Sequence, residues 1–443
     1  MLASISRRSA RFFFATALAL LVLEADGVVG QTLSDPNLTI TTHGSNFSAP
    51  TQLRFLGDDP NDYFVTEKNT GIVKAVINGV ASTALDLNVA NDSERGLLGI
   101  ALHPGFSTNK QVYLYYSARP GGDGPNNWTD NRLERFLWNG TTLTADGSFP
   151  TVTFGSTADL LANGPNHDAG PILFGPGPNA KLYGTTGDLN RDAAEQNNTS
   201  ASTTSAKVGG IYRLNDDGTA AADNPFFANA NPDFRRWYAY GVRNTYGAAF
   251  DPATGNLWDT ENGLNSYDEI NLVASGFNSG WDSIMGPDAR NGANAPADLV
   301  NLPGSTYSDP EFSFLTPVAV TGIEFLIGSA LGSAYDNAVV VGAANTGELY
   351  LLRLNGARTG FVLSGDLTDL VADSTAERNA VLFGQNFGNA FQGVVDLQVG
   401  PDGGLYVVSL GRGVIYRIAA VPEPASLIML TIAAIALLRH RRR

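Results

Sequence analysis

The chain has 443 residues, a formal net charge of −15 and only 16% charged residues. This acidic balance excludes a general nucleic-acid-binding protein, because phosphate binding needs a basic face. The 49 glycines favour many short strands joined by tight turns, and the absence of cysteine excludes stabilisation by disulfides.

The first predicted element is a secretory signal peptide over residues 1–30. Three arginines within the first eleven residues precede an apolar run over residues 12–23. This run is shorter than the roughly 20 residues that a spanning helix needs, which favours export and cleavage over a permanent N-terminal anchor. We therefore expect an exported mature chain that begins near Gln31 and lies in the periplasm, on the outer surface or outside the cell.

A two-strand pattern then recurs six times between residues 31 and 420. In each copy an apolar run is followed by a turn and by a second run rich in β-branched and aromatic residues. The copies span residues 55–67, 99–116, 174–184, 250–259, 322–342 and 399–408. Repeats at this spacing indicate radial architecture, and four-stranded blades around a channel fit it best. The sequence therefore predicts an all-β fold, a six-bladed β-propeller, with a site built on the loops of one face.

A histidine lies shortly before the strand predicted near Phe174. His167 stands between Asn166 and Asp168. A neutral imidazole near a propeller face can take a proton from a substrate hydroxyl group at neutral pH. A loop histidine that makes only structural hydrogen bonds is the alternative interpretation.

A second group of polar residues precedes and follows the strand predicted near residue 250. Arg243 can polarise a carbonyl or bind a carboxylate through its fork of donors, or it can pair with a loop carboxylate at the surface. Further along, Asp268 and Glu269 can bind a hard cation or cap a turn.

Residues 421–443 form the last predicted element. A Val-Pro-Glu-Pro sequence precedes an apolar run over residues 425–438 and an arginine-rich end. This pattern resembles the PEP-CTERM sorting tail of exopolysaccharide-producing Gram-negative bacteria. The resemblance implies transient membrane association and removal of the tail after export, with the basic cluster on the cytoplasmic side. An ordinary C-terminal anchor is the alternative.

Several motifs together resemble the soluble quinoprotein sugar dehydrogenases, or glucose/sorbosone dehydrogenase family. Asn-His-x-x-Gly, Gly-x-Arg-Asn-x-x-Gly, Glu-Asn-Gly, Asp-Glu-Ile-Asn and Gly-x-Asn-x-Gly-Trp occur in family order, after Gly-Leu-Leu-Gly at residues 96–99. The resemblance covers nearly the whole mature chain. It implies a six-bladed propeller that binds pyrroloquinoline quinone (PQQ) and calcium and oxidises an aldose or related sugar at its anomeric carbon.

The resemblance also implies roles for residues at the site. His167 corresponds to the catalytic base that takes the proton of the anomeric hydroxyl group. Arg243 corresponds to the residue that stabilises charge on the reduced cofactor. Asn244, Asn166 and Asp168 are expected to contact the cofactor.

Calcium binding is implied at two places. The carbonyl groups of Gly263 and Leu264 correspond to ligands of the calcium beside the cofactor, although the family usually has Gly-Pro where this chain has Gly-Leu. Glu311 is a candidate ligand of a second, structural calcium.

The chain departs from the family in the cations that hold the cofactor's carboxylates. Well-studied members use a lysine in a later blade and an Arg-x-Arg pair, but residues 342–347 contain no lysine and residues 393–396 no arginine. Each lost charged hydrogen bond costs about 1.5–3 kcal/mol. Arg353, Arg358 and Arg378 are candidates to supply the missing charge.

Two other functions remain open from the sequence. The first is a non-catalytic extracellular propeller that binds polysaccharide or another surface partner. The second is a propeller hydrolase of the lactonase kind, with a central calcium held by carboxylates such as Glu67, Glu261 and Asp268.

Overall fold

The computed structural model describes residues 30–157, 164–190, 198, 207–292, 296–388 and 392–422. The predicted signal peptide and sorting tail lie outside these residues, except for Gly30, Val421 and Pro422. The folded unit described below begins at Gln31. No helix in the described ranges is long and apolar enough to cross a membrane.

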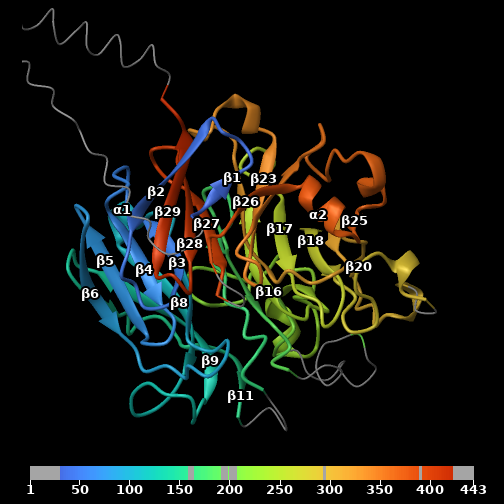
Figure 1. Cartoon of the computed structure of the whole chain (residues 1–443). Coiled ribbons are helices and arrows are strands. Elements are labelled where there is room, and N and C mark those ends of the chain that lie inside the picture. The colour runs from blue at the N-terminus through green and yellow to red at the C-terminus, as the bar shows by residue number, and fades with distance from the viewer. Residues whose placement is uncertain are drawn as a thin grey trace, which may run out of the picture. The chain divides into compact units, whose positions relative to one another are not determined.

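Within the described ranges, the strands assemble into six mainly antiparallel sheets (Figure 1). Their innermost strands are β3 (Pro50–Phe55), β7 (Leu97–Leu102), β12 (Ile172–Phe174), β16 (Thr245–Phe250), β22 (Val320–Phe325) and β27 (Val394–Val399). The second strands are β4 (Tyr63–Glu67), β8 (Gln111–Ala118), β13 (Leu182–Thr186), β17 (Leu257–Glu261), β23 (Ala338–Ala343) and β28 (Leu405–Ser409). Each repeat found in the sequence thus supplies the first two strands of one sheet.

Two further layers of strands complete the sheets. The third strands are β5 (Ile72–Ile77), β9 (Asp130–Trp138), β14 (Gly210–Leu214), β18 (Asp268–Val273), β24 (Leu349–Arg353) and β29 (Val414–Ala420). The outer strands are β6 (Val80–Asp86), β10 (Leu143–Ala145), β11 (Val152–Ser156), β15 (Trp237–Tyr240), β21 (Phe312–Phe314), β26 (Leu382–Gln385) and β2 (Leu38–Gly44). Short strands at the edges are β1 (Thr32–Leu33), β19 (Phe277–Asn278), β20 (Thr306–Tyr307) and β25 (Val371–Ala372).

Helical segments are short and lie between strands. The α-helices are α1 (Phe106–Asn109) and α2 (Thr375–Ala380), and the 3-10 turns are η2 (Pro232–Arg236), η3 (Asp288–Arg290), η4 (Pro296–Asp298), η5 (Ser333–Tyr335) and η6 (Gly365–Asp369). A capping box stabilises α2, in which Ser374 accepts from the backbone of Glu377 and the Glu377 carboxylate accepts in return from Ser374. These short helical segments lie between the strands of an all-β fold.

The six sheets close into a ring. Each innermost strand contacts the next in chain order, and β27 contacts β3. The ring is joined by the N-terminal strand β2, which pairs antiparallel with the C-terminal strand β29 from Leu38 opposite Ala420 to Gly44 opposite Ile415. Figure 1 shows this blue strand beside the red one. The predicted β-propeller is confirmed.

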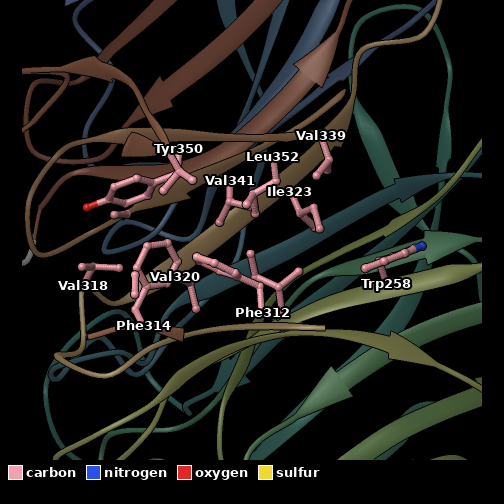
Figure 2. Packing of buried hydrophobic residues seen from close by; sticks show 14 of the residues in the cluster. Trp258, Phe312, Phe314, Val318, Val320, Ile323, Val339, Val341, Tyr350 and Leu352 are labelled. Atoms are coloured by element: carbon pink, nitrogen blue, oxygen red, sulfur yellow. The ribbon is translucent and has the colours of Figure 1, made fainter. Parts of the chain in front are cut away.

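Hydrophobic side chains fill the space between neighbouring sheets. In Figure 2, Phe312 and Phe314 of β21 face Val320, Ile323 and the strands behind them, so that the sheet containing β17, β18 and β21 packs on the sheet containing β22, β23 and β24. Because a blade is covered on both faces, its middle strands are apolar without alternation. Residues 112–118 of β8 are all buried. This packing fixes the ends of the strands, and the loops between them build the site.

Candidate active site

Connections at one end of the propeller channel enclose a cavity of about 570 Å³. Along β16, Tyr246 lines both this cavity and a second one, which continues along residues 247–250 of the strand. Residues from the connections or strands of all six sheets contribute to the first cavity, among them Lys68, Glu94, His167, Arg243, Thr321 and Val395. The cavity therefore lies at the centre of the ring of six sheets.

The structure brings together most of the residues that the sequence predicted for the site. The cavity wall contains His167, Arg243, Asn244, Asn166, Gly263 and Leu264. Two predicted residues are not in the wall, namely Asp168 and Glu311. The imidazole and the guanidinium group thus belong to one cavity, as the predicted oxidation chemistry requires.

His167 is held by a buried carboxylate. Its Nδ1 lies 2.5 Å from Oδ1 of Asp188, and Oδ2 of Asp188 accepts a hydrogen bond from the indole nitrogen of Trp281 at 3.0 Å. Because a carboxylate oxygen accepts, the proton of the neutral imidazole belongs on Nδ1. Nε2 is then an acceptor and can take a proton from a hydroxyl group in the cavity. The sequence analysis gave Asp188 no role.

Glu94 joins two walls of the cavity. Its Oε2 accepts from the backbone N–H of His167 at 2.7 Å and from Nδ2 of Asn244 at 3.1 Å. The first bond holds the His167 backbone at a φ of +63°, a left-handed conformation that is uncommon for a residue other than glycine. Sequence reasoning missed Glu94, whose only signal was its place two residues before the glycine of the Gly-Leu-Leu-Gly motif.

Arg243 is anchored to the loop that follows β17. Its Nη1 donates to the carbonyl groups of Asn262 and Gly263, each at 2.9 Å. The guanidinium carbon lies 5.4 Å from the ring centroid of Trp281, within cation–π range. Nε of Arg243 is buried and has no partner in the described part of the chain. The residue therefore keeps a free donor in a cavity wall.

Asn166 and Asp168 occupy different environments on either side of His167. Asn166 lines the cavity, and its side-chain oxygen is hydrogen-bonded to the hydroxyl group of Ser93. Asp168 is fully buried behind the wall, where it accepts from Asn131 at 2.9 Å and lies 3.7 Å from Arg95. Burial raises the pKa of Asp168 to about 6, although Arg95 and Asn131 lower it. Asp168 therefore supports the cavity wall from behind and does not line the cavity.

Asp268 holds the predicted calcium-binding loop in place through hydrogen bonds to backbone N–H groups. One carboxylate oxygen accepts from the N–H of Gly263 at 3.0 Å, and the other accepts from the N–H groups of Val318 and Ala319 at 2.8 and 2.7 Å. Burial raises the pKa of Asp268 to about 6, and these bonds lower it. The side chain of Leu264 lies at the cavity with 52% of its surface exposed. Asp268 therefore caps this turn, one of the two roles expected for it.

Glu311 lies outside the cavity, beside β18 and just before β21. Its Oε2 accepts from the backbone N–H of Leu272 at 2.5 Å, and burial raises its pKa to about 7. In the described ranges, no group of three or more His, Cys, Asp or Glu residues could hold a metal ion. The structural calcium at Glu311 stays a prediction.

Two buried glutamates lie behind Arg243. Glu261 of β17 and Glu269 of β18 are cross-strand partners. Glu261 accepts from the backbone N–H of Arg243 at 2.7 Å, and Glu269 accepts from the N–H of Gly286 at 2.5 Å. Burial and repulsion by Asp259 raise the pKa of Glu261 to about 8, and burial and repulsion by Glu261 raise that of Glu269. Two buried carboxyl groups with raised pKa values bind a proton readily.

The cations suggested as replacements for the family's lysine and arginines are not at the site. Arg353, Arg358 and Arg378 do not line the cavity. Arg358 instead forms a buried ion pair with Asp251, with distances of 2.6 and 2.7 Å. Lys68 lines the cavity from the first sheet, a position that the sequence analysis did not single out.

The carboxylates named for a lactonase-like hydrolase do not form a central cage. Only Asp268 of the three lines the cavity, and its oxygens accept backbone hydrogen bonds. Glu67 accepts from the N–H of Ser48 at 2.9 Å and lies outside the wall. Glu261 is behind Arg243. The geometry therefore gives this hypothesis no support.

Comparison with known proteins agrees with the sequence motifs. Residues 47–417 match the glucose/sorbosone dehydrogenase family. Quinoprotein glucose dehydrogenase B of Acinetobacter calcoaceticus is 31% identical over 264 residues, which cover 55% of this chain and 52% of that protein. An aldose sugar dehydrogenase of Escherichia coli is 26% identical over 318 residues, covering 71% of this chain and 74% of that protein. The match thus spans about half the length of the first relative.

Solved structures share the fold. A putative oxidoreductase (glucose dehydrogenase) of Thermus thermophilus has a TM-score of 0.63 at 26% identity, over 86% of this chain and 99% of that one. The soluble aldose sugar dehydrogenase of Escherichia coli has a TM-score of 0.64 at 22% identity, over 87% and 100%. From the family match, the motifs and the propeller fold together, we conclude that this chain belongs to the glucose/sorbosone dehydrogenase family of PQQ-dependent sugar dehydrogenase β-propellers.

Proposed function

We propose that this chain is a sugar dehydrogenase that oxidises the anomeric hydroxyl group of an aldose, with PQQ as the electron acceptor. One observation carries the proposal: an imidazole oriented by a buried carboxylate, His167 on Asp188, shares a cavity with Arg243, whose Nε has no partner among the described residues. The names of two relatives, a quinoprotein glucose dehydrogenase and an aldose sugar dehydrogenase, agree with it.

The polar groups of the wall fit a cofactor that bears carbonyl and carboxylate groups. Nε of Arg243 and Oδ1 of Asn244 are both buried without partners in the described residues, so each can bond a ligand. Lys68 adds a second cation, and the carbonyl groups of Gly263 and Leu264 offer oxygens of the kind that calcium prefers. These residues would hold the quinone and its calcium.

The chain's own residues supply the proton chemistry. Nε2 of His167 takes the proton of the anomeric hydroxyl group, while Asp188 stabilises the imidazolium that forms. When bound, PQQ supplies an acceptor for the hydride that leaves the anomeric carbon. The sugar loses two electrons and two hydrogens and becomes a lactone. Arg243 provides fixed positive charge where negative charge develops.

The function is tested with purified protein, PQQ, calcium, an artificial dye acceptor and a panel of aldoses. We expect dye reduction that His167→Ala lowers by about 100-fold or more, the effect of losing a general base. His103→Ala is the matched control, because this imidazole does not line the cavity. Glycan binding without dye reduction under any condition would instead favour the non-catalytic polysaccharide-binding propeller.

We also propose that the chain is exported and processed at both ends. The support is the sequence pattern alone, with a basic and apolar start and a Val-Pro-Glu-Pro, apolar and arginine-rich end. Mass spectrometry of the protein from its native cells should find a mature chain that begins near Gln31 and ends near residue 420. An intact terminus in the cytoplasmic fraction would contradict export.

A further inference from the structure

Lys68 is a buried cation in the cavity wall. It follows β4 directly and is 7% exposed. Its Nζ donates to Oδ1 of Asn69 and to the carbonyl group of Arg95, each at 2.9 Å, and both acceptors are uncharged. Within the described ranges, no carboxylate oxygen lies within 4.0 Å of Nζ of Lys68, which is the limit for an ion pair. An ammonium group has three donors, so one remains for the cavity.

This arrangement is unfavourable for folding alone. Burying an ammonium group that makes no ion pair costs several kcal/mol, more than burying a neutral polar group. Burial accordingly lowers the pKa of Lys68 to about 8, even though Asp168, Glu94 and Asp92 act in the opposite direction. An apolar side chain of similar length would fill the same space without this cost. A structural role therefore does not explain the lysine, whereas an anionic ligand does.

We infer that Lys68 binds a carboxylate group of the ligand that occupies the cavity. This inference rests on the proposed function, which offers two sources of a carboxylate: the quinone cofactor and an acidic sugar substrate. With Arg243, the wall then has two cations from two different sheets. Lys68 takes over, from the first sheet, the charge that residues 342–347 and 393–396 do not provide.

The first test is an absorbance titration of the apoprotein, with calcium present, using PQQ and its trimethyl ester. We expect Lys68→Met to weaken PQQ binding about 10- to 100-fold, the change for one charge-assisted hydrogen bond. Binding of the ester, which lacks the carboxylate charges, should be unchanged. Lys68→Arg should restore part of the PQQ affinity, and Lys74→Met, on β5 of the same sheet, should have no effect.

The second test distinguishes the source of the carboxylate. Calorimetry compares glucuronate with glucose as ligands of the wild type and of Lys68→Met. Loss of a glucuronate preference with unchanged PQQ binding assigns the carboxylate to the substrate. If neither PQQ nor glucuronate binding changes in Lys68→Met, the inference is overturned. If the wild type binds no PQQ, the proposed function fails, and the glucuronate comparison still decides the role of Lys68.

Thermal unfolding separates ligand binding from a structural role. Lys68→Met removes a buried charge, so we expect its Tm in the absence of ligand to equal or exceed that of the wild type. A lower Tm, together with equal loss of PQQ and ester binding, would show that the lysine only supports the wall and would overturn the inference.

Discussion

Trp281 contacts both halves of the candidate active site. Its indole N–H donates to Asp188, the carboxylate that orients His167, and its ring lies beneath the guanidinium group of Arg243. The backbone of Trp281 is held in place as well, because its backbone N–H donates to the carbonyl group of Gly241. It is a positioning residue that couples the orientation of the base to that of the cation.

The Trp281→Phe variant separates these two contacts. Phenylalanine keeps an aromatic face for Arg243 but cannot donate to Asp188. We expect kcat/KM with an aldose to fall about 10-fold, the usual effect of removing one supporting hydrogen bond, while PQQ binding changes little. Steady-state kinetics and the absorbance titration check this. Trp138→Phe, in the second sheet and away from the cavity, is the control, and equal kinetics of the two variants would contradict the proposed role.

At the scale of the elements, glycines allow the innermost strands to converge on the channel. A Cβ atom on Gly247 of β16 would lie 2.1 Å from the carbonyl oxygen of Thr321 on β22. A Cβ atom on Gly322 of β22 would lie 2.8 Å from the backbone nitrogen of Leu397 on β27. Both neighbours are backbone atoms and cannot move aside alone. Strand spacing at the centre of the ring therefore depends on these glycines.

Gly247→Ala should separate β16 from β22. We expect a loss of about 1–3 kcal/mol in the free energy of unfolding, as for other overpacked sites. Because Tyr246, next in the chain, lines the cavity, ligand binding should weaken as well. Denaturant unfolding measures the effect. Gly356→Ala, where no atom lies within 4 Å of the new Cβ, should be nearly neutral.

At the scale of the whole molecule, both ends of the folded unit complete sheets begun elsewhere. β1 pairs with β26, and β2 pairs with β29. The first two strands of the chain therefore complete sheets whose other strands come from the C-terminal part of the chain. Such pairing joins residues from the two ends of the folded unit, and β2 covers the edge that β29 would otherwise expose. Closure of the ring therefore uses residues from both ends of the folded unit.

Removing residues 31–44 should therefore open the ring. We expect a fall in Tm of more than about 5 °C, since two sheets lose a strand each and the hydrophobic side chains that cluster with Leu38, such as Tyr416 and Ile418, lose their cover. A chain that ends at Pro422 is the control, because it keeps β29 complete. A truncated protein that keeps the Tm of the control would contradict closure by β2.

The second cavity on the channel carries its own electrostatic cost. Glu324 of β22 lines it, and burial, assisted by repulsion from Asp396 and opposed by Arg54, raises the pKa of Glu324 to about 8. A raised carboxyl pKa means that the folded state binds a proton more tightly than the unfolded state. Stability therefore falls as pH rises from the unfolded pKa of about 4.3 towards 8.

Glu324→Gln should remove this pH dependence. We expect the variant to be more stable than the wild type near pH 8, by about 2–5 °C in Tm, and to lose the difference near pH 4. Thermal unfolding across this pH range is the measurement. An equal Tm difference at both ends of the range would show that packing, not the carboxylate charge, is responsible.

The sequence by itself determined the architecture and the two leading site residues. Six local strand pairs predicted six blades. A blade is buried on both faces, so its strands appear in the sequence as continuous apolar runs. His167 and Arg243 stand in motifs short enough to be recognised, and the ring places both in one cavity. These features depend on neighbours in sequence.

Only the tertiary structure decided which residues surround them. Asp188, Glu94 and Lys68 reach the site from separate loops, and their roles follow from how the six sheets meet. Asp168, adjacent to His167 in sequence, lies behind the wall, since successive side chains of an irregular or extended segment point in different directions. A cavity built at the centre of a ring is made of long-range contacts, and these are fixed by ring closure and packing, which no local pattern encodes.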